Sequence, residues 1–369
     1  MNRRAFVAAV AVGAVGVCRG VDAEEAAATA PSAGEPSPSK LPRWRGFNLL
    51  EKFNDRHSGA FHEADFELLS EWGFNLVRLP MSYRCWTDPS DWLKLREGPL
   101  KEVDQAVEFG RRHGIHVNLN LHRAPGYCVN PPEEPADLWK EDSALEACAF
   151  HWAHLARRYK GVPSSRVSFD LLNEPKDLEE PVYARVVRRL VQAIRAEDPG
   201  RLIIADGLKW GTAPVAALAD LGIAQSTRGY SPSQVSHYRA SWVEGADQWA
   251  QPTWPITVVR KEEDGTEKRE FWDKDRLRRE RIEPWRQLQA KGVGVHVGEW
   301  GCHNRTPHDV ALAWMKDQLD LWNEAGWGWA LWNLRGSFGV LDSDRADVTY
   351  DMFRGRRLDR AMLELLRAS

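Results

Sequence analysis

From residue 44 onward, short apolar runs alternate with longer stretches in which apolar residues recur every three or four positions. The short runs have the length of buried strands, and the longer stretches have the period of amphipathic helices. The runs that predict strands are 44–48, 76–80, 115–121, 167–172, 202–205, 234–238, 293–298 and 328–332. Helices are predicted at 61–73, 99–113, 142–160, 179–197, 275–291 and 307–325, with a last one near 358–368. Eight strands in alternation with helices predict an α/β fold, in which a parallel sheet closes into a single-domain (β/α)8 TIM barrel.

One long interval departs from this alternation. Residues 239–272 follow the predicted sixth strand and show no clear periodicity, and they contain Trp242, Trp249, Trp254 and Trp272. Loops of this length inside compact domains are usually functional or disordered. The clustered tryptophans favour an ordered loop that shapes a substrate-binding surface, and the charged stretch 261–268 is predicted to be a solvated turn.

The first 23 residues predict an export signal peptide and no part of the fold. Arg3 and Arg4 precede an apolar run over 5–17, and a small-residue cleavage site follows at 21–23. The paired arginines resemble a twin-arginine signal, and an ordinary secretory signal fits about as well. Both interpretations predict a periplasmic or extracellular protein.

Composition narrows the class of partner. The chain has 369 residues, of which 43% are hydrophobic and 28% charged, and its formal net charge is -3. Because no concentrated basic face is available for phosphates, we expect no nucleic-acid partner. The 18 tryptophans exceed what packing needs, and their flat apolar faces suit stacking on sugar rings, which predicts a carbohydrate ligand.

The remaining general expectations concern organisation and cysteine chemistry. Residues 24–42 are predicted to be a flexible tail, which leaves 43–369 as the folded domain, with no cofactor or metal, no membrane contact in the mature form and a monomeric state. Four cysteines follow the signal: Cys85, Cys128, Cys148 and Cys302. Cys85 and Cys128 are the favoured disulfide pair if one forms, and four free thiols are an equally plausible outcome.

Polar residues lie at the carboxyl ends of the predicted strands, where the active sites of such barrels are found. These residues are Arg78, His122, Asn173, Glu174, His237, Tyr238, Glu299 and Trp332. A single arginine or histidine of this kind is easily explained by packing. Their convergence on one rim of the barrel predicts a catalytic or binding site.

Two glutamates carry the chemistry of this prediction. Glu174 and Glu299 each end an apolar strand, and an isolated buried carboxylate is costly unless it has partners. Glycoside hydrolysis needs a pair of this kind, one carboxylic acid to protonate the leaving oxygen and one carboxylate to meet the anomeric carbon. Strands four and seven face each other across the barrel mouth, so their carboxyl groups are expected at roughly 5–5.5 Å, the separation of retaining enzymes.

The ordered motifs resemble those of family 5 glycoside hydrolases, the cellulase-type members of a retaining clan, over nearly all of residues 44–368. The matching segments are Arg45-Gly46-Phe47-Asn48, Gly73-Phe74-Asn75-Leu76-Val77-Arg78, Leu119-Asn120-Leu121-His122, Asn173-Glu174-Pro175, Gly298-Glu299-Trp300-Gly301 and Trp329-Ala330-Leu331-Trp332, together with the strand around His237. The resemblance implies that Glu174 is the acid/base and Glu299 the nucleophile. Because the acid/base starts its cycle protonated, we expect its pKa to be raised.

The same resemblance implies roles for the remaining candidates. Asn173 would bind the 2-hydroxyl of the sugar, and Arg78 would hold the nucleophile ionised. His122 and His237 would position the substrate and tune the acid/base, and Trp332 would form the floor under the sugar that is cleaved.

One segment departs from the family pattern. The family commonly has His-x-Tyr on strand six, with the tyrosine in contact with the nucleophile, whereas here His237 is followed directly by Tyr238 and Arg239. Either Tyr238 reaches inward through a local irregularity, or Arg239 replaces it, or the contact is missing. Arg239 is alternatively a ligand for an acidic group on the substrate.

The expected activity is endo-acting hydrolysis of a β-linked glucan, either cellulose-like or mixed-linkage. A β-mannanase or an exo-β-glucosidase is the alternative within the family, because specificity depends on the loops. A non-catalytic carbohydrate-binding barrel is the alternative from another class, and the presence of both glutamates disfavours it. A metal-dependent hydrolase is disfavoured because His122 and His237 are far apart and no local metal-ligand spacing occurs.

Overall fold

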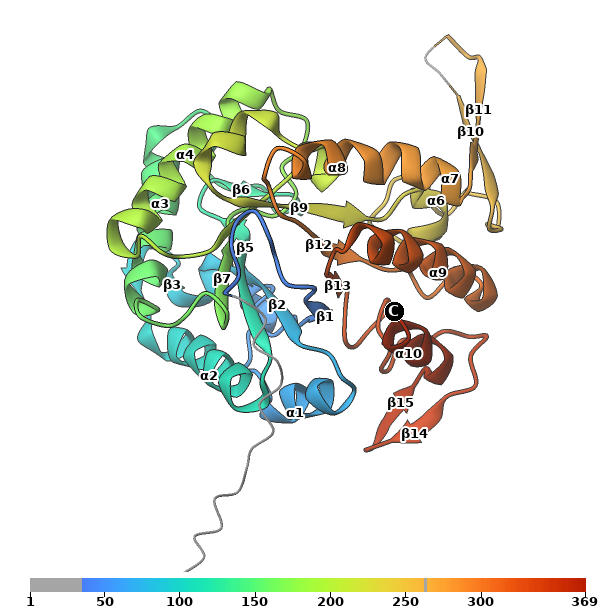
Figure 1. Ribbon diagram of the computed structural model, residues 1–369, viewed down its shortest axis with the longest axis horizontal. Coiled ribbons are helices and arrows are strands. Elements are labelled where there is room, and N and C mark those ends of the chain that lie inside the picture. Colours follow the sequence, from blue (N-terminus) through green and yellow to red (C-terminus); the bar gives the residue numbers. More distant parts are fainter. Residues whose placement is uncertain (1–34, 262–263) are drawn as a thin grey trace, which may run out of the picture. The chain divides into compact units, whose positions relative to one another are not determined.

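The computed structural model describes residues 35–261 and 264–369. Within them, eight parallel strands form a ring with helices outside it (Figure 1). In chain order the strands are β1 (Arg45–Asn48), β2 (Leu76–Ser82), β5 (His116–Ala124), β7 (Val167–Asp170), β8 (Ile203–Asp206), β9 (Ala224–Gly229), β12 (Val295–Trp300) and β13 (Trp329–Leu331). The pairing runs β2-β1-β13-β12-β9-β8-β7-β5, and an additional β2–β5 pairing closes the ring. The predicted (β/α)8 barrel is confirmed.

The helices match the predicted amphipathic stretches closely. They are α1 (Glu63–Glu71), α2 (Glu97–His113), α3 (Asp142–Arg158), α4 (Glu180–Glu197), α8 (Glu283–Gln289), α9 (His308–Ala325) and α10 (Arg360–Arg367). A short helix, α7 (Lys274–Leu277), and a π-helical turn over Arg278–Ile282 lead into α8. Helix α9 ends at Gly326, which adopts φ +74° and so supplies the left-handed residue that commonly terminates a helix.

The sixth strand was predicted at the wrong place. It is β9, Ala224–Gly229, whereas the predicted segment 234–238 overlaps the short helix α6 (Ser233–Ser236). The sequence of β9 is Ala-Gln-Ser-Thr-Arg-Gly, which has no apolar run because polar side chains are buried on both faces of this strand. Gln225, for example, is fully buried and bonds both backbone groups of Val215.

The interval after β9 contains a β-hairpin and not only a loop. Strands β10 (Ile256–Lys261) and β11 (Glu267–Trp272) pair antiparallel and extend away from the barrel beside α7 in Figure 1. Asp264 and Gly265 lie at its tip, and an Asp-Gly pair is a common hairpin signal. At the base of the hairpin Trp254 donates to Asp317 of α9, so this tryptophan anchors the hairpin to the barrel.

Near the N-terminus, part of the predicted tail contacts the barrel. The backbone carbonyl of Pro38 accepts a hydrogen bond from Gly294 at 2.7 Å, and Leu41 packs against a cluster that contains Trp44. These contacts place residues 35–42 against the barrel and not in a free linker. The predicted signal peptide and the first part of the tail lie outside the described residues.

All four cysteines in the described part of the chain are free, so the favoured Cys85–Cys128 disulfide is not formed. Cys85, Cys148 and Cys302 are buried in the apolar core, where burial raises the pKa of each thiol. None of the described helices has both the length and the apolar character needed to cross a membrane.

Candidate active site

The carboxyl ends of the barrel strands bring most of the predicted site residues together. Arg78 lies on β2, His122 on β5 and Glu299 on β12, while Asn173 and Glu174 follow β7 and Trp332 follows β13. Arg78, His122, Asn173 and Glu299 are connected directly by hydrogen bonds or ion pairs, and the Glu174 side chain joins them through Arg228. Trp332 joins through ring contacts, stacking on His122 with centroids 5.6 Å apart.

Arg78 is the fully buried centre of this group. Its guanidinium donates to Asp170 at 2.8 Å, to Asn173 at 2.9 Å and to Glu299 Oε1 at 2.5 Å, and it also donates to Asn48. A buried arginine with this many charged and amide partners is fixed in orientation, because each donor points along a set direction. Arg78 therefore fixes the position of the Glu299 carboxylate.

Glu174 is held by its backbone as well as by its side chain. Its φ is +50°, a left-handed conformation that costs a non-glycine residue about 1–2 kcal/mol. The Glu174 amide donates to Asp206 Oδ2 at 2.8 Å, and its carbonyl accepts from Tyr127 at 2.6 Å. Burial, together with the charge of Glu299, raises the pKa of Glu174 to about 8, as expected for a carboxyl that must begin a cycle protonated.

Arg228, on β9, is a site residue that the sequence analysis missed. Its guanidinium donates to Glu174 Oε1 at 3.1 Å and to Asn173 Oδ1 at 2.9 Å, and it lies 3.6 Å from Glu299 Oε1. Both terminal nitrogens also bond Asp206, which ends β8 and is completely buried. One guanidinium thus contacts both glutamates, so the two carboxyl groups face the same space.

The tyrosine expected beside the nucleophile is Tyr230 and not Tyr238. Tyr230 follows β9 directly, and its hydroxyl donates to Glu299 Oε2 at 3.4 Å. Tyr238 is buried within the following loop, and Arg239 is exposed with its guanidinium over the Tyr238 ring. The strand-six motif is therefore Arg228-Gly229-Tyr230, in which arginine occupies the expected histidine position.

His237 lies next to the site although it is not on a strand. Its ring meets the Tyr230 ring edge to face at 4.9 Å, and its Nδ1 bonds the Ser236 hydroxyl at 2.8 Å. Burial lowers the pKa of His237 to about 4, so the imidazole is neutral at pH 7. Trp242 is 58% exposed and packs its edge near His237, which leaves a large apolar ring accessible beside the site.

His122 is buried between Glu299 and the aromatic residues Phe53 and Trp332. Its Nδ1 lies 3.8 Å from Glu299 Oε1, and its Nε2 is within 3.4 Å of the Asn173 amide nitrogen. Burial and the nearby arginines lower the pKa of His122 well below its usual value, so it remains neutral. Phe53 packs its edge against both His122 and Trp332, which holds these two rings in place.

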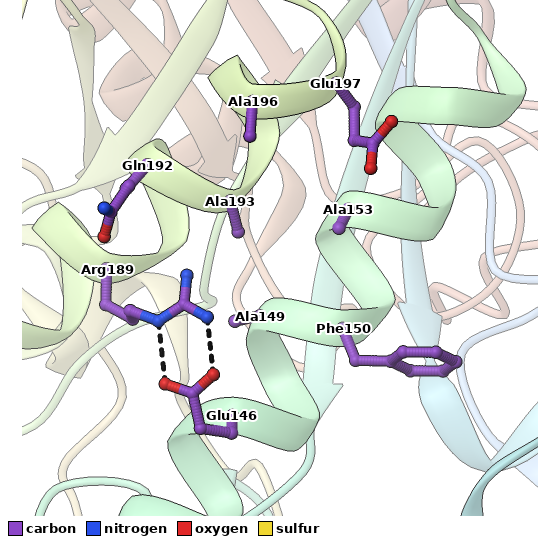
Figure 2. A pocket seen from close by; sticks show the side chains of 9 residues that line it. All are labelled: Glu146, Ala149, Phe150, Ala153, Arg189, Gln192, Ala193, Ala196 and Glu197. Atoms are coloured by element: carbon purple, nitrogen blue, oxygen red, sulfur yellow. Dashed lines mark hydrogen bonds and ion pairs between the residues drawn. The ribbon is translucent and has the colours of Figure 1, made fainter.

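Two pockets differ in their relation to these residues. One, of about 540 Å³, lies on the outside of the barrel between α3 and α4, is lined by nine residues of which four are alanines, and has the Glu146–Arg189 ion pair along one side (Figure 2). It includes none of the candidate residues. The other, of about 210 Å³, is lined by the segments Asn48–Glu51 and Asn333–Arg335 and therefore adjoins the site through Asn48, the partner of Arg78.

The electrostatics of the site suit acid/base chemistry. Arg78 and Arg228 lie among four acidic side chains: Asp170, Glu174, Asp206 and Glu299. Burial and the charge of Asp206 raise the pKa of Asp170, although this carboxyl group also accepts a hydrogen bond from Arg78. No group of three or more His, Cys, Asp or Glu among the described residues is arranged to hold a metal ion.

Comparison with known proteins agrees with this geometry. Endoglucanase C of Acetivibrio thermocellus is 24% identical over 81% of this chain and 92% of its own length, and a β-xylosidase of Phanerodontia chrysosporium is 24% identical over 80% of this chain and 61% of its own. The crystal structure of a glycoside hydrolase, 38% identical, covers 88% of this chain and 99% of its own with a TM-score of 0.82. The family description that matches residues 33–337 is cellulase, glycosyl hydrolase family 5. The chain therefore belongs to glycosyl hydrolase family 5, the cellulase family, and is a glycoside hydrolase.

Proposed function

We propose that this enzyme is a retaining glycoside hydrolase that cleaves β-linked glucan chains internally, with Glu174 as acid/base and Glu299 as nucleophile. The observation that carries the proposal is the guanidinium of Arg228, which lies 3.1 Å from Glu174 and 3.6 Å from Glu299. Two carboxyl groups that share one guanidinium are close enough to act on the same glycosidic bond. The raised pKa of Glu174, about 8, keeps a proton available for the leaving group.

The reaction proceeds in two displacements at the anomeric carbon. Glu174 gives its proton to the glycosidic oxygen as Glu299 attacks the anomeric carbon, and the bond to the leaving sugar breaks. Glu174, now ionised, then takes a proton from water, whose oxygen attacks the same carbon and releases the Glu299 carboxylate. The Asn173 Oδ1 accepts from both arginines, and one N–H of its NH2 group faces His122 Nε2, which leaves the other N–H to donate to the sugar 2-hydroxyl.

Several features next to the carboxyl groups favour a carbohydrate ligand. Trp332 is half-buried beside His122, and Trp242 is exposed beside His237. Accessible aromatic faces suit stacking on a chain of sugar units.

Two experiments test this proposal. Incubation with an activated 2-deoxy-2-fluoro glycoside, followed by peptide mass analysis, is expected to place the label on Glu299, and a label elsewhere would overturn the nucleophile assignment. Reducing-sugar release from β-glucan, carboxymethylcellulose, glucomannan and xylan would then identify the substrate. Early oligosaccharides of mixed length indicate internal cleavage, whereas release of a single sugar indicates an exo-β-glucosidase and a clear preference for glucomannan indicates a β-mannanase.

We also propose that the enzyme is exported, because Arg3 and Arg4 precede an apolar run that ends before a small-residue cleavage site. Cell fractionation of the full chain tests this directly. Loss of export in an R3K/R4K variant would assign the signal to the twin-arginine route, and normal export would assign it to the ordinary secretory route. Retention of the unmodified chain in the cytoplasm would contradict the proposal.

A further inference from the structure

Arg228 makes more hydrogen bonds in the site than charge neutralisation alone would require. Its side chain is 1% exposed, and its three nitrogens all donate hydrogen bonds. Both terminal nitrogens bond Asp206, one of them also bonds Asn173, and Nε is directed at Glu174 Oε1. The guanidinium plane is therefore fixed on several sides, and the position of its Nε–H is fixed with it.

Two glycines provide the space that this side chain occupies. A Cβ at Gly211 would lie 2.6 Å from Arg228 Cγ, and a Cβ at Gly298 would lie 2.8 Å from an Arg228 terminal nitrogen. Gly211 also has φ +74°, a conformation that other residues adopt at a cost. Segments after β8 and on β12 thus leave room specifically for the long side chain on β9.

The chemistry of arginine determines what this contact does to Glu174. A guanidinium has only donors and stays charged, so the Glu174 oxygen that faces Nε–H must act as an acceptor. When Glu174 is protonated, Oε1 is therefore the carbonyl oxygen and the hydrogen resides on Oε2. No hydrogen bond from another described residue engages Oε2, and the Glu174 side chain is 16% exposed.

We propose that Arg228 is a positioning residue that selects Oε2 of Glu174 as the oxygen that carries the catalytic proton. The same oxygen then serves both halves of the reaction, first as donor to the glycosidic oxygen and afterwards as acceptor from water. Asp206 completes the arrangement, because it balances the arginine charge and also accepts the Glu174 backbone amide. This inference rests on the proposed function of Glu174.

The electrostatic effect of Arg228 gives the inference a second readout. The charge of Arg228 lowers the pKa of Glu174, and the charge of Asp206 raises it by less. Removing the two charges together should therefore raise the pKa of Glu174. The basic limb of the kcat/KM profile, which reports the acid in the free enzyme, should then move to higher pH.

The experiment compares aryl β-glycosides with good and poor leaving groups, on the sugar that the wild type prefers. A dinitrophenyl leaving group needs little protonation, whereas a methoxyphenyl leaving group depends on the acid. The variants are R228H and the charge-neutral pair R228Q/D206N, with E174Q as reference. R201K is the matched control, because Arg201 is equally buried but bonds backbone carbonyls after α3 and at the start of β7, away from Glu174.

We expect both Arg228 variants to lose kcat/KM about tenfold or more on the methoxyphenyl substrate and much less on the dinitrophenyl substrate. We also expect their basic limb to shift upward by about one pH unit. R201K should change neither quantity. Equal losses on both substrates, or an unmoved basic limb, would overturn the role of Arg228. If E174Q itself shows no dependence on the leaving group, the proposed function fails instead.

Discussion

The hydroxyl of Tyr230 donates to Glu299 Oε2 at 3.4 Å, and Arg78 donates to the other oxygen of the same carboxylate at 2.5 Å. The two donors approach from β9 and β2, strands that are not neighbours in the barrel. Together they fix the plane of the carboxylate, so an attack on the anomeric carbon needs no search for orientation. The Tyr230 hydroxyl thus helps to orient the Glu299 carboxylate.

A Y230F variant should keep the fold and lose turnover. The phenyl ring preserves the edge contact with His237, whereas the hydrogen bond to Glu299 is removed. We expect kcat to fall about tenfold or more, since positioning of a reacting group by one hydrogen bond contributes on this scale. Y238F is the matched control, because Tyr238 is buried in the next loop. A larger effect in Y238F than in Y230F would contradict the assignment.

Replacing the nucleophile should abolish activity without unfolding the protein. Glutamine in E299Q has nearly the same size and can still accept from Arg78, but it does not form the glycosyl intermediate. We expect kcat to fall about a thousandfold or more. Circular dichroism and thermal melting would establish that the fold is intact, and near-normal turnover in a folded E299Q protein would remove Glu299 from the mechanism.

The raised pKa of Glu174 also predicts how stability depends on pH. Its folded pKa is about 8, against about 4.5 for the ordinary carboxyl group. The folded state thus holds a proton that the unfolded chain releases, so this contribution to the free energy of unfolding is complete below pH 4.5 and disappears as pH rises through 8. In E174Q the group cannot ionise.

We therefore expect the melting temperature of E174Q to rise relative to that of the wild type as pH increases from 4.5 to 8, with no further change above that range. Thermal melts at several pH values provide the measurement. A difference between the two proteins that is constant with pH would show that Glu174 does not retain its proton in the folded protein.

His296 gives the opposite dependence at acid pH. It is buried on β12 inside the barrel, with Nδ1 unpartnered, and burial lowers its pKa to about 3. Because the unfolded chain binds a proton near pH 6.5 and the folded chain does not, stability falls as pH drops from 6.5 towards 3. The free energy of unfolding of H296N should fall less steeply over this range. H57N, which alters an exposed histidine, should follow the wild type.

Much of the site was accessible from the sequence because its residues terminate apolar strands. Glu299 ends Val-His-Val-Gly, and Glu174 follows Leu171-Leu172-Asn173; in both cases the change from apolar to acidic residues marks the rim of the barrel. Helices such as α4 were equally clear from their period. The strand ends and the helix periods both result from burial against the core, and the pattern of hydrophobic residues along the sequence shows that burial directly.

The sixth strand was missed because its environment is polar. Gln225, Ser226, Thr227 and Arg228 are all buried on β9. Ser226 and Arg228 bond each other inside the barrel, and Gln225 and Thr227 bond Val215 and Gly211 on the opposite face of the strand. A pattern search looks for apolar runs and has no means of recognising such a strand. Two features could have located this strand. The spacing between strands five and seven leaves room for it, and Arg-Gly-Tyr follows at the end of a short segment.

The backbone conformation of Glu174 means that this carboxyl group is ordered when the protein folds and not when the substrate binds. Its left-handed turn and its two anchored peptide groups restrict the acid/base to rotation about its own side-chain bonds. The loss of conformational entropy that orders this carboxyl group is incurred when the chain folds, before any sugar arrives. Substrate therefore meets an acid whose reorganisation is already complete, and its binding energy remains available for distorting the glycosidic bond.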